Sequence, residues 1–389
     1  MKHRVVDFAL YRSRLQKYDY DVITIAGGDF TLPDSGTLEA ILGSKSAAEE
    51  GNSNFRGVRD PAVDGLIAAI GRAETMQQLR DAARALDRAL APALIAFARH
   101  YLRPPYAIDG WRVDVIHMMG EGPGAAGNLE LIASFRAAVK AERSDAYLLG
   151  EHFFEASRWL QGPHEDGAMN YFGFAQPLRA FLAGLDVAYH PCRIDAAEFD
   201  QWLTAARARI PYANALCQLN LLDSHDTRRF LTMVNGDRQL LLLGLLLLIS
   251  YPGVPCLYYG TEVGLEGEND PDNRRCMIWD QGQQDQQLLA HCRQLLSLRQ
   301  QWPALSHGGY LTLHAAGDLF IFARLLEADG KQPQQQLVIA INRGQQQGEI
   351  SGEHPLLAGR QWQRLWGEGQ QYDGQLLLPP VSGSLWLLV

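Results

Sequence analysis

Three short segments of the chain consist of apolar residues followed by a carboxylate. They are Ile108–Asp114, Tyr147–His152 and Leu221–Asp226. Parallel strands of α/β proteins often end in this way, because their bodies are buried and their carboxyl ends meet at the rim where the chemistry takes place. Three acids from three strands, with an arginine and histidines close in sequence, indicate a hydrolase that works through paired carboxylates.

Asp114 follows Arg112 by two residues, so on a strand both side chains point to the same face. A guanidinium beside a carboxylate favours the ionised form. An ionised, oriented carboxylate can attack the anomeric carbon of a sugar or stabilise an oxocarbenium ion. Taken alone, the spacing fits equally well a buried pair that only fixes the strand.

Glu151 ends the second apolar run. Burial beside apolar residues tends to raise the pKa of a carboxyl group, which is the state that a general acid needs near neutral pH. An acid at a strand end that caps the following helix is the alternative for this segment alone.

Asp226 follows His225 in the third segment, and the two side chains could bind adjacent hydroxyls of one sugar ring. The alternative is a helix N-cap, because Asp, Ser and Thr are good capping residues. Asp223 and Ser224 can fill that capping role, which would leave Asp226 available for substrate.

Together the segments resemble the second, third and fourth signature regions of the α-amylase family of glycoside hydrolases. The matching residues are Gly110–Asp114, Gly150–His152 and Ser224–Asp226. The stretch Pro252–Glu262 resembles the family's segment on the last barrel strand. Residues 269–275 and 279–280 resemble the loop that follows, and the resemblance runs from about residue 93 to the end.

The resemblance implies that Asp114 is the nucleophile, Glu151 the acid/base and Asp226 the stabiliser of the transition state. It also implies that the substrate is bound by Arg112, His117, His152 and His225, and that neither a metal nor a cofactor is needed. The implied reaction is retaining hydrolysis of α-1,4-glucosidic bonds in maltodextrins with release of glucose.

The details around His117 and in Glu151–Phe153 resemble the maltodextrin glucosidases of the family more than its secreted amylases. We therefore expect an α-glucosidase of that branch. A hydrolase of the cyclomaltodextrinase or neopullulanase type is the alternative, and end-product analysis separates the two.

The elements that must position these residues alternate between strands and helices from Ala91 to Gln301, which indicates parallel βα units. Strands are expected to end near Asp114, Glu151, Asn170, Asp223 and Tyr259. Helices are expected at 128–142, 176–185, 196–210 and 237–250.

Five strands are fewer than the eight of a closed barrel, and no counterpart of the family's first signature region precedes Asp114. We therefore predict an α/β fold in which residues 93–302 form a partial (β/α)8 barrel, corresponding to its C-terminal half. Weak or no glucosidase activity is expected of the isolated chain. Residues 303–389 alternate in polarity and predict a small antiparallel β-sandwich.

Residues 1–92 differ in sequence pattern from the rest of the chain. A strand is expected at Val22–Ala26, and helices are expected at 61–73 and 75–90. Within about residues 5–90, four short segments resemble a fragment of a periplasmic oligopeptide-binding protein, namely Asp7–Tyr11, Ile41–Lys45, Asp60–Asp64 and Arg84–Arg88. A peptide-binding transport protein fragment is therefore the alternative from another functional class.

Composition limits the partners. A net charge of −9 without any cluster of Lys and Arg argues against nucleic acid. The longest apolar run, Leu240–Ile249, is shorter than the ~20 residues of a membrane span. Five cysteines without a CxxC pair favour reduced thiols in a cytoplasmic protein. The expected partner is a maltodextrin or related α-glucan, and the sequence leaves the oligomeric state open.

Overall fold

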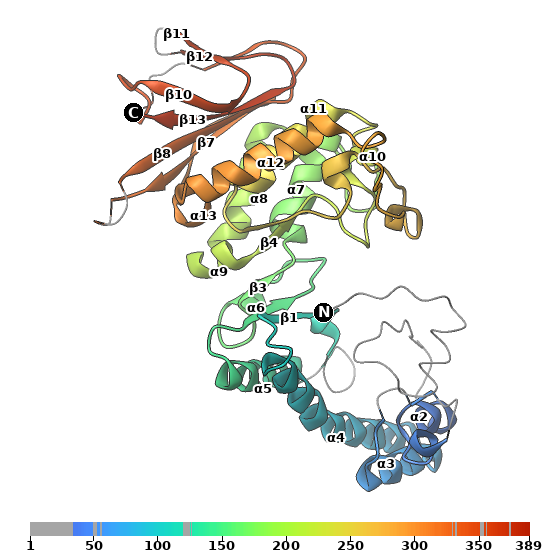
Figure 1. Cartoon of the computed structure of the whole chain (residues 1–389). Helices are drawn as coiled ribbons and strands as arrows, with labels where there is room; N and C mark the ends of the chain where they lie inside the picture. Colours follow the sequence, from blue (N-terminus) through green and yellow to red (C-terminus); the bar gives the residue numbers. More distant parts are fainter. Residues whose placement is uncertain are drawn as a thin grey trace. The chain divides into compact units, whose positions relative to one another are not determined.

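The computed structural model describes residues 34–49, 53–54, 57–119, 125, 127–328, 330, 333–350, 354, 356–372 and 375–389 (Figure 1). Contacts divide the chain into two compact units. The first comprises residues 1–111 and 117–146, and the second comprises residues 112–116 and 147–389. The strand expected at Val22–Ala26 lies outside the described residues.

Helices build the described part of the first unit. They are α2 (Ser35–Leu42), η1 (Ser46–Ala48), α3 (Pro61–Gly71), α4 (Met76–Leu102) and α5 (Asn128–Glu142). The side chains of Asp34, Asp60 and Thr75 accept hydrogen bonds from the first turns of α2, α3 and α4 and so fix where these helices begin. The three helices bury one apolar cluster, made of Leu42, Val63, Ile67, Ile70 and Leu86.

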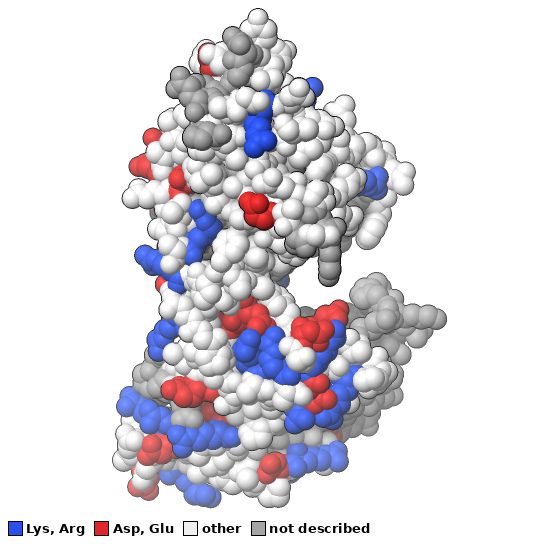
Figure 2. Space-filling model, turned by 90° about the vertical axis from the view of Figure 1, so that its left-hand side faces the viewer, with Lys and Arg blue, Asp and Glu red and all other residues white. Residues whose placement is uncertain are grey.

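Helix α4 is longer than the sequence predicts. The helix expected at 75–90 continues to Leu102 and contains Pro92, so the predicted boundary between residues 92 and 93 falls inside it. Arg99 of α4 and Arg103, which directly follows that helix, both pair with Glu142 of α5 and so join the two helices. The helices α2 to α5 form the lower part of the view in Figure 2. Basic and acidic side chains are intermixed over the visible face of this part.

The second unit contains five short strands. They are β1 (Gly110–Val113), which begins in the first unit, β2 (Tyr147–Gly150), β3 (Gly167–Ala168), β4 (Leu219–Leu221) and β5 (Val254–Cys256). The acid-bearing segments follow three of them, β1, β2 and β4. Strands β1, β2 and β3 form one sheet, and the parallel strands β4 and β5 form another. A parallel bridge from Met169 to Leu219 continues the order from β3 to β4. All five strands lie where the sequence predicts them.

Most helices of the second unit lie on the side of β4 that faces the β domain (Figure 1). The helices of this unit are α6 (Ser157–Leu160), η3 (Tyr171–Ala175), α7 (Gln176–Leu178), η4 (Arg179–Ala183), α8 (Ala196–Ala208), α9 (Tyr212–Cys217), α10 (Phe230–Met233), α11 (Arg238–Ser250), η5 (Thr261–Val263), η6 (Asp272–Arg274), α12 (Gln286–Gln301) and α13 (Ala304–His307). The helix expected at 176–185 begins earlier, because the π-helical turns of η3 and η4 extend α7 at both ends.

The C-terminal part is an antiparallel β domain, as predicted. Its strands are β6 (Gly309–Ala316), β7 (Leu319–Leu326), β8 (Gln335–Asn342), β9 (Gly348–Ile350), β10 (Trp362–Gly367), β11 (Gln370–Tyr372), β12 (Gln375–Leu378) and β13 (Ser382–Leu388). A five-stranded sheet in the order β10–β13–β8–β7–β6 lies over a three-stranded sheet in the order β11–β12–β9. Val338 and Trp386 of the larger sheet pack against Leu376 and Leu378 of the smaller one.

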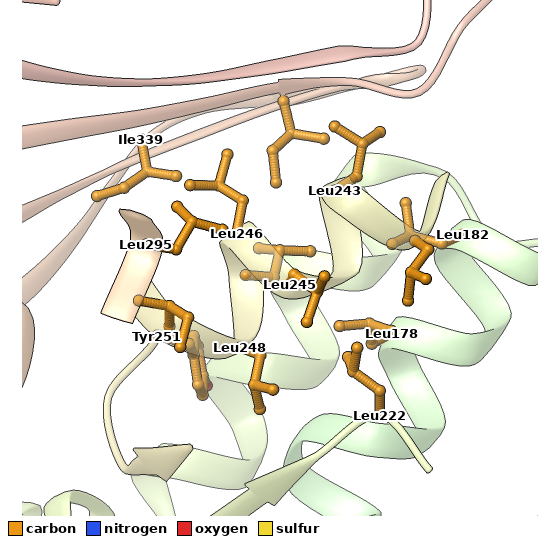
Figure 3. Packing of buried hydrophobic residues seen from close by; sticks show 14 of the residues in the cluster. Leu178, Leu182, Leu222, Leu243, Leu245, Leu246, Leu248, Tyr251, Leu295 and Ile339 are labelled. Atoms are coloured by element: carbon orange, nitrogen blue, oxygen red, sulfur yellow. The ribbon is translucent and has the colours of Figure 1, made fainter. Parts of the chain in front are cut away.

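The other face of the five-stranded sheet covers the buried helix α11. Side chains alternate between the two faces of a strand, so Ile339 points to the helices while its neighbour Val338 points to the second sheet. Figure 3 shows Ile339 beside Leu246 of α11 and Leu295 of α12. This packing explains why the Leu-rich run is apolar on all sides. Among the described helices, none combines the length and the hydropathy that a membrane crossing requires.

Arg324 of β7 joins the β domain to the ends of two helices. Its guanidinium is fully buried and donates to the carbonyl oxygens of Ser250 (2.6 Å), Leu305 (2.8 Å) and Gly308 (2.8 Å). Burial lowers the pKa of Arg324 to about 10. Backbone oxygens at the C-terminal ends of α11 and α13 thus supply most of the partners of this cation.

We predict that Arg324→Met lowers the free energy of unfolding by roughly 3–5 kcal/mol, because the buried carbonyl group of Ser250 loses its charged donor and those of Leu305 and Gly308 each lose one of two side-chain donors. Chemical unfolding followed by tryptophan fluorescence measures the change. Arg360→Met, at an exposed position of the same domain, is the matched control and should alter stability little. Equal stability of the two variants would contradict the structural role of Arg324.

Candidate active site

The guanidinium of Arg112 joins two of the three predicted acids. Its Nη1 pairs with Oδ1 of Asp114, and its Nη2 lies 2.8 Å from Oε1 of Glu151. Arg112 belongs to β1, Asp114 follows the end of that strand, and Glu151 follows the end of the neighbouring strand β2. One cation therefore holds two carboxylates that approach from adjacent strands.

The two carboxylates differ sharply in their exposure to solvent. The side chain of Asp114 is 72% exposed, whereas that of Glu151 is only 3% exposed. Oε2 of Glu151 accepts a hydrogen bond of 2.8 Å from the backbone N–H of Val115. Val115 has a φ of +36°, a conformation that β-branched residues rarely adopt, so the turn after Asp114 is strained.

The environment of Glu151 favours its protonated form. Burial raises the pKa of this carboxyl group, and the nearby negative charges of Asp114 and Asp226 raise it further. The hydrogen bond from Val115 and the charge of Arg112 oppose this rise without cancelling it. Glu151 therefore keeps its proton to a higher pH than an ordinary glutamate, as a general acid requires.

Asp226 supplies the third acid from the loop after β4. Its Oδ2 lies 3.0 Å from Nε2 of His225, and its Oδ1 lies 3.4 Å from Nη2 of Arg274. The charge of Asp226 acts on the pKa of both Glu151 and Tyr171, so these three groups share one electrostatic environment. With a side chain 29% exposed, Asp226 remains accessible to a ligand.

A network of hydrogen bonds fixes the loop that carries Asp226. Asn273 of η6 donates to the carbonyl oxygens of His225 (2.7 Å) and Thr227 (2.9 Å). The hydroxyl groups of Tyr171 and Ser224 lie 2.8 Å apart, and Ser224 Oγ accepts from the backbone N–H of Asp226 at 3.1 Å. The backbone of Asp226 is thus held from two other elements, η3 and η6.

Asp223, rather than Asp226, serves the start of the next helix. Its buried carboxylate accepts a hydrogen bond of 2.8 Å from the N–H of Phe230, the first residue of α10. The hydroxyl of Thr261 lies 3.2 Å from the same oxygen. The capping interpretation of the third segment therefore applies to Asp223.

Six of the seven predicted site residues lie in the second unit, and five of them form the acid site. These five are Arg112, Asp114, Glu151, His225 and Asp226. His117 lies on η2 (Ile116–Met118) and belongs to the first unit, so its role in substrate binding remains a prediction.

His152 differs from the expectation. Its side chain is fully buried, with Nε2 3.0 Å from both carboxyl oxygens of Glu165 and its ring 4.5 Å from that of Trp159. Successive side chains at a strand end point to opposite sides, so the side chain of His152 points away from that of Glu151 and into the protein interior. This burial argues against a direct contact between His152 and a substrate.

Three further residues of the site escaped the sequence analysis. Tyr171 directly follows the predicted strand end at Asn170, and this position could have indicated that Tyr171 belongs to the site. Asn273 and Arg274 fall within the loop segment quoted above, but only the structure shows that they contact the loop of Asp226. Within the described ranges, no three His, Cys, Asp or Glu side chains are grouped so as to hold a metal ion.

Comparisons with known proteins point to one family. Residues 86–300 match the family model of the α-amylase catalytic domain. The chain is 35% identical over 298 residues to a cyclomaltodextrinase of Geobacillus thermopakistaniensis, covering 75% of this chain and 47% of that relative. It is 36% identical over 284 residues to neopullulanase 2 of Thermoactinomyces vulgaris, covering 72% and 45% of the two chains.

A solved structure agrees with these matches. The native debranching enzyme of Nostoc punctiforme has a TM-score of 0.67 and 33% identity, and the alignment covers 77% of this chain and 62% of that one. The chain spans less than half the length of the two relatives above. The family match begins at residue 86, inside α4, so it gives no support to a likeness of residues 5–90 to an oligopeptide-binding protein.

The buried Asp223 gives a testable pH dependence. Burial raises its pKa from 3.8 to about 6, so the native state holds this proton more tightly than the unfolded state does. Stability should therefore fall as the pH rises from about 4 to about 6, by on the order of 1–3 kcal/mol. We predict that Asp223→Asn removes this part of the slope in unfolding curves measured across that range. A constant difference between wild type and variant would contradict the assignment.

Proposed function

Since the chain belongs to the α-amylase family of glycoside hydrolases, we propose that its acid site hydrolyses α-1,4-glucosidic bonds with retention of configuration. The family predicted from the three acid segments is confirmed by the catalytic-domain match. The observation that best supports the proposed chemistry is the shared guanidinium of Arg112, which holds Asp114 and Glu151 beside each other.

In the proposed first step, the exposed Asp114 carboxylate attacks the anomeric carbon of a bound glucose unit. Glu151 donates its proton to the glycosidic oxygen as the bond from carbon to that oxygen breaks. An ester between the sugar and Asp114 results, and the shortened glucan leaves with the proton. Asp226 stabilises the positive charge that develops on the sugar ring in the transition state.

In the second step, the Glu151 carboxylate removes a proton from water, and the oxygen of that water displaces Asp114 from the anomeric carbon. Both carboxyl oxygens of Glu151 are engaged in this structure, one by Arg112 and one by Val115. Substrate binding therefore has to release one of them before Glu151 can reach the glycosidic oxygen.

For the substrate, we propose cyclomaltodextrins and short linear maltodextrins. The names of the relatives, a cyclomaltodextrinase and a neopullulanase, favour this choice over the maltodextrin glucosidase branch. The sequence around Glu151–Phe153 supports the glucosidase as a second candidate. Maltose as the main product from β-cyclodextrin would favour the first candidate, and glucose released from linear maltodextrins alone would favour the second.

We further propose that β1 to β5 represent the later part of the family's barrel. Support comes from their parallel order and from the share of the relatives that the chain spans. The test of the chemistry is chosen to detect single turnovers.

The proposed nucleophile can be tested by trapping. We predict that a fluorinated α-glucosyl fluoride, which slows release of the sugar, adds one glycosyl group to Asp114, detected by peptide mass spectrometry. Asp114→Asn should abolish the label and lower hydrolysis by at least about 100-fold, because the covalent route is lost. A label on Glu151 or on Asp226 instead would refute the assignment.

Glu151→Gln provides the matched control for the acid. This variant should lose hydrolysis of maltosides about 100-fold or more, because it cannot protonate the leaving oxygen. It should still react with the glucosyl fluoride, whose leaving group needs no proton. Equal loss with both kinds of substrate would instead indicate that Glu151 acts only through the fold.

A further inference from the structure

A groove lies between the helices α11 and α12 and the strands β10 and β13. Its volume is about 390 Å³, near the lower end of the ~300–1,000 Å³ typical of small-molecule sites. None of its lining residues belongs to the acid site described above. We propose that this groove is a second binding site for a short α-glucan. The choice of sugar rests on the proposed function of the acid site.

The wall of the groove on the β domain is built around Trp366. The register of β10 against β13 shifts between Arg364 and Trp366, and such bulges change the direction of the side chains beside them. The indole of Trp366 is only 6% exposed and meets the ring of His291 of α12 edge to face, with 5.6 Å between centroids. Two aromatic rings from separate elements thus line one cavity.

Both rings carry a polar atom that lacks a partner. Among the described residues, Nε1 of Trp366 and Nδ1 of His291 are buried and make no hydrogen bond. Buried polar groups of this kind are rare in folded proteins, because losing water without gaining a partner is unfavourable. A sugar hydroxyl group can both accept from an indole N–H and donate to an imidazole nitrogen.

The rim of the groove suits a neutral ligand that is rich in hydroxyl groups. Gln239 of α11 and Gln294 of α12 are exposed, and each amide offers both a donor and an acceptor. Arg364 and Glu368 line the same groove with opposite charges, so the site favours neither anions nor cations. Leu242, Leu243 and Leu365 add apolar surface for the C–H faces of a sugar ring.

Binding of a glucan in this groove would keep long substrates attached to the protein during catalysis. A glucan that occupies the groove raises the effective concentration of its remaining glucose units near the same molecule. The groove therefore adds affinity for longer chains without entering the chemistry at Asp114.

The test uses the full chain labelled with fluorotryptophan and carrying Asp114→Asn, which prevents turnover of the sugar. Eight tryptophans give eight fluorine resonances, and Trp366→Phe identifies the one from the groove. We expect titration with maltotriose to shift the Trp366 resonance in a saturable manner. The double variant Gln239→Ala, Gln294→Ala changes only exposed residues and should abolish that shift while the spectrum stays that of a folded protein.

The Trp366 resonance reports the groove alone, whereas trapping at Asp114 reports the acid site, so the two proposals can fail separately. Glycerol at the same concentration is the control for bulk effects of polyols. A Trp366 resonance that stays unmoved up to tens of millimolar maltotriose, or that shifts equally in the double glutamine variant, would overturn the second site.

Discussion

The site depends on one guanidinium shared between two carboxylates. Carboxylates at neighbouring strand ends repel each other, and the cation of Arg112 between Asp114 and Glu151 offsets that repulsion. The two carboxyl groups differ in their exposure to solvent, and they therefore differ in their chemical behaviour. The exposed one is available as a nucleophile, and the buried one has a raised pKa. Two strands, one cation and unequal burial therefore give two carboxyl groups of different character, as the proposed acid and nucleophile require.

The third acid reaches this pair through a loop that other elements hold. Asn273 binds carbonyl groups on both sides of Asp226, and Tyr171 reaches the same loop through Ser224. In the same unit, α11 is buried between α12 and the five-stranded sheet, and Arg324 fixes the end of that helix. The β domain thus contributes to the site indirectly, by supporting the helix that packs against β5.

Much of this arrangement follows from local sequence. An apolar run that ends in an acid predicts a strand end, and the predicted helix at 128–142 has the observed bounds of α5. Orientation and tertiary contacts do not follow from local patterns. The burial of His152 depends on Glu165 beneath it, and the role of Asn273 depends on a loop far away in sequence. The extension of α4 through Pro92 shows that strong helix formers on both sides can override one proline.

The central claim is that Asp114, Glu151 and Asp226 share one electrostatic environment. A carboxyl-carbon NMR titration of Glu151 in wild type, Asp114→Asn and Asp226→Asn measures it without requiring turnover. Each variant removes a negative charge that raises the pKa of Glu151, so each should lower that pKa, whereas Asp186→Asn, at an exposed site elsewhere in the unit, should not. A Glu151 pKa that is the same in all four proteins would contradict the account.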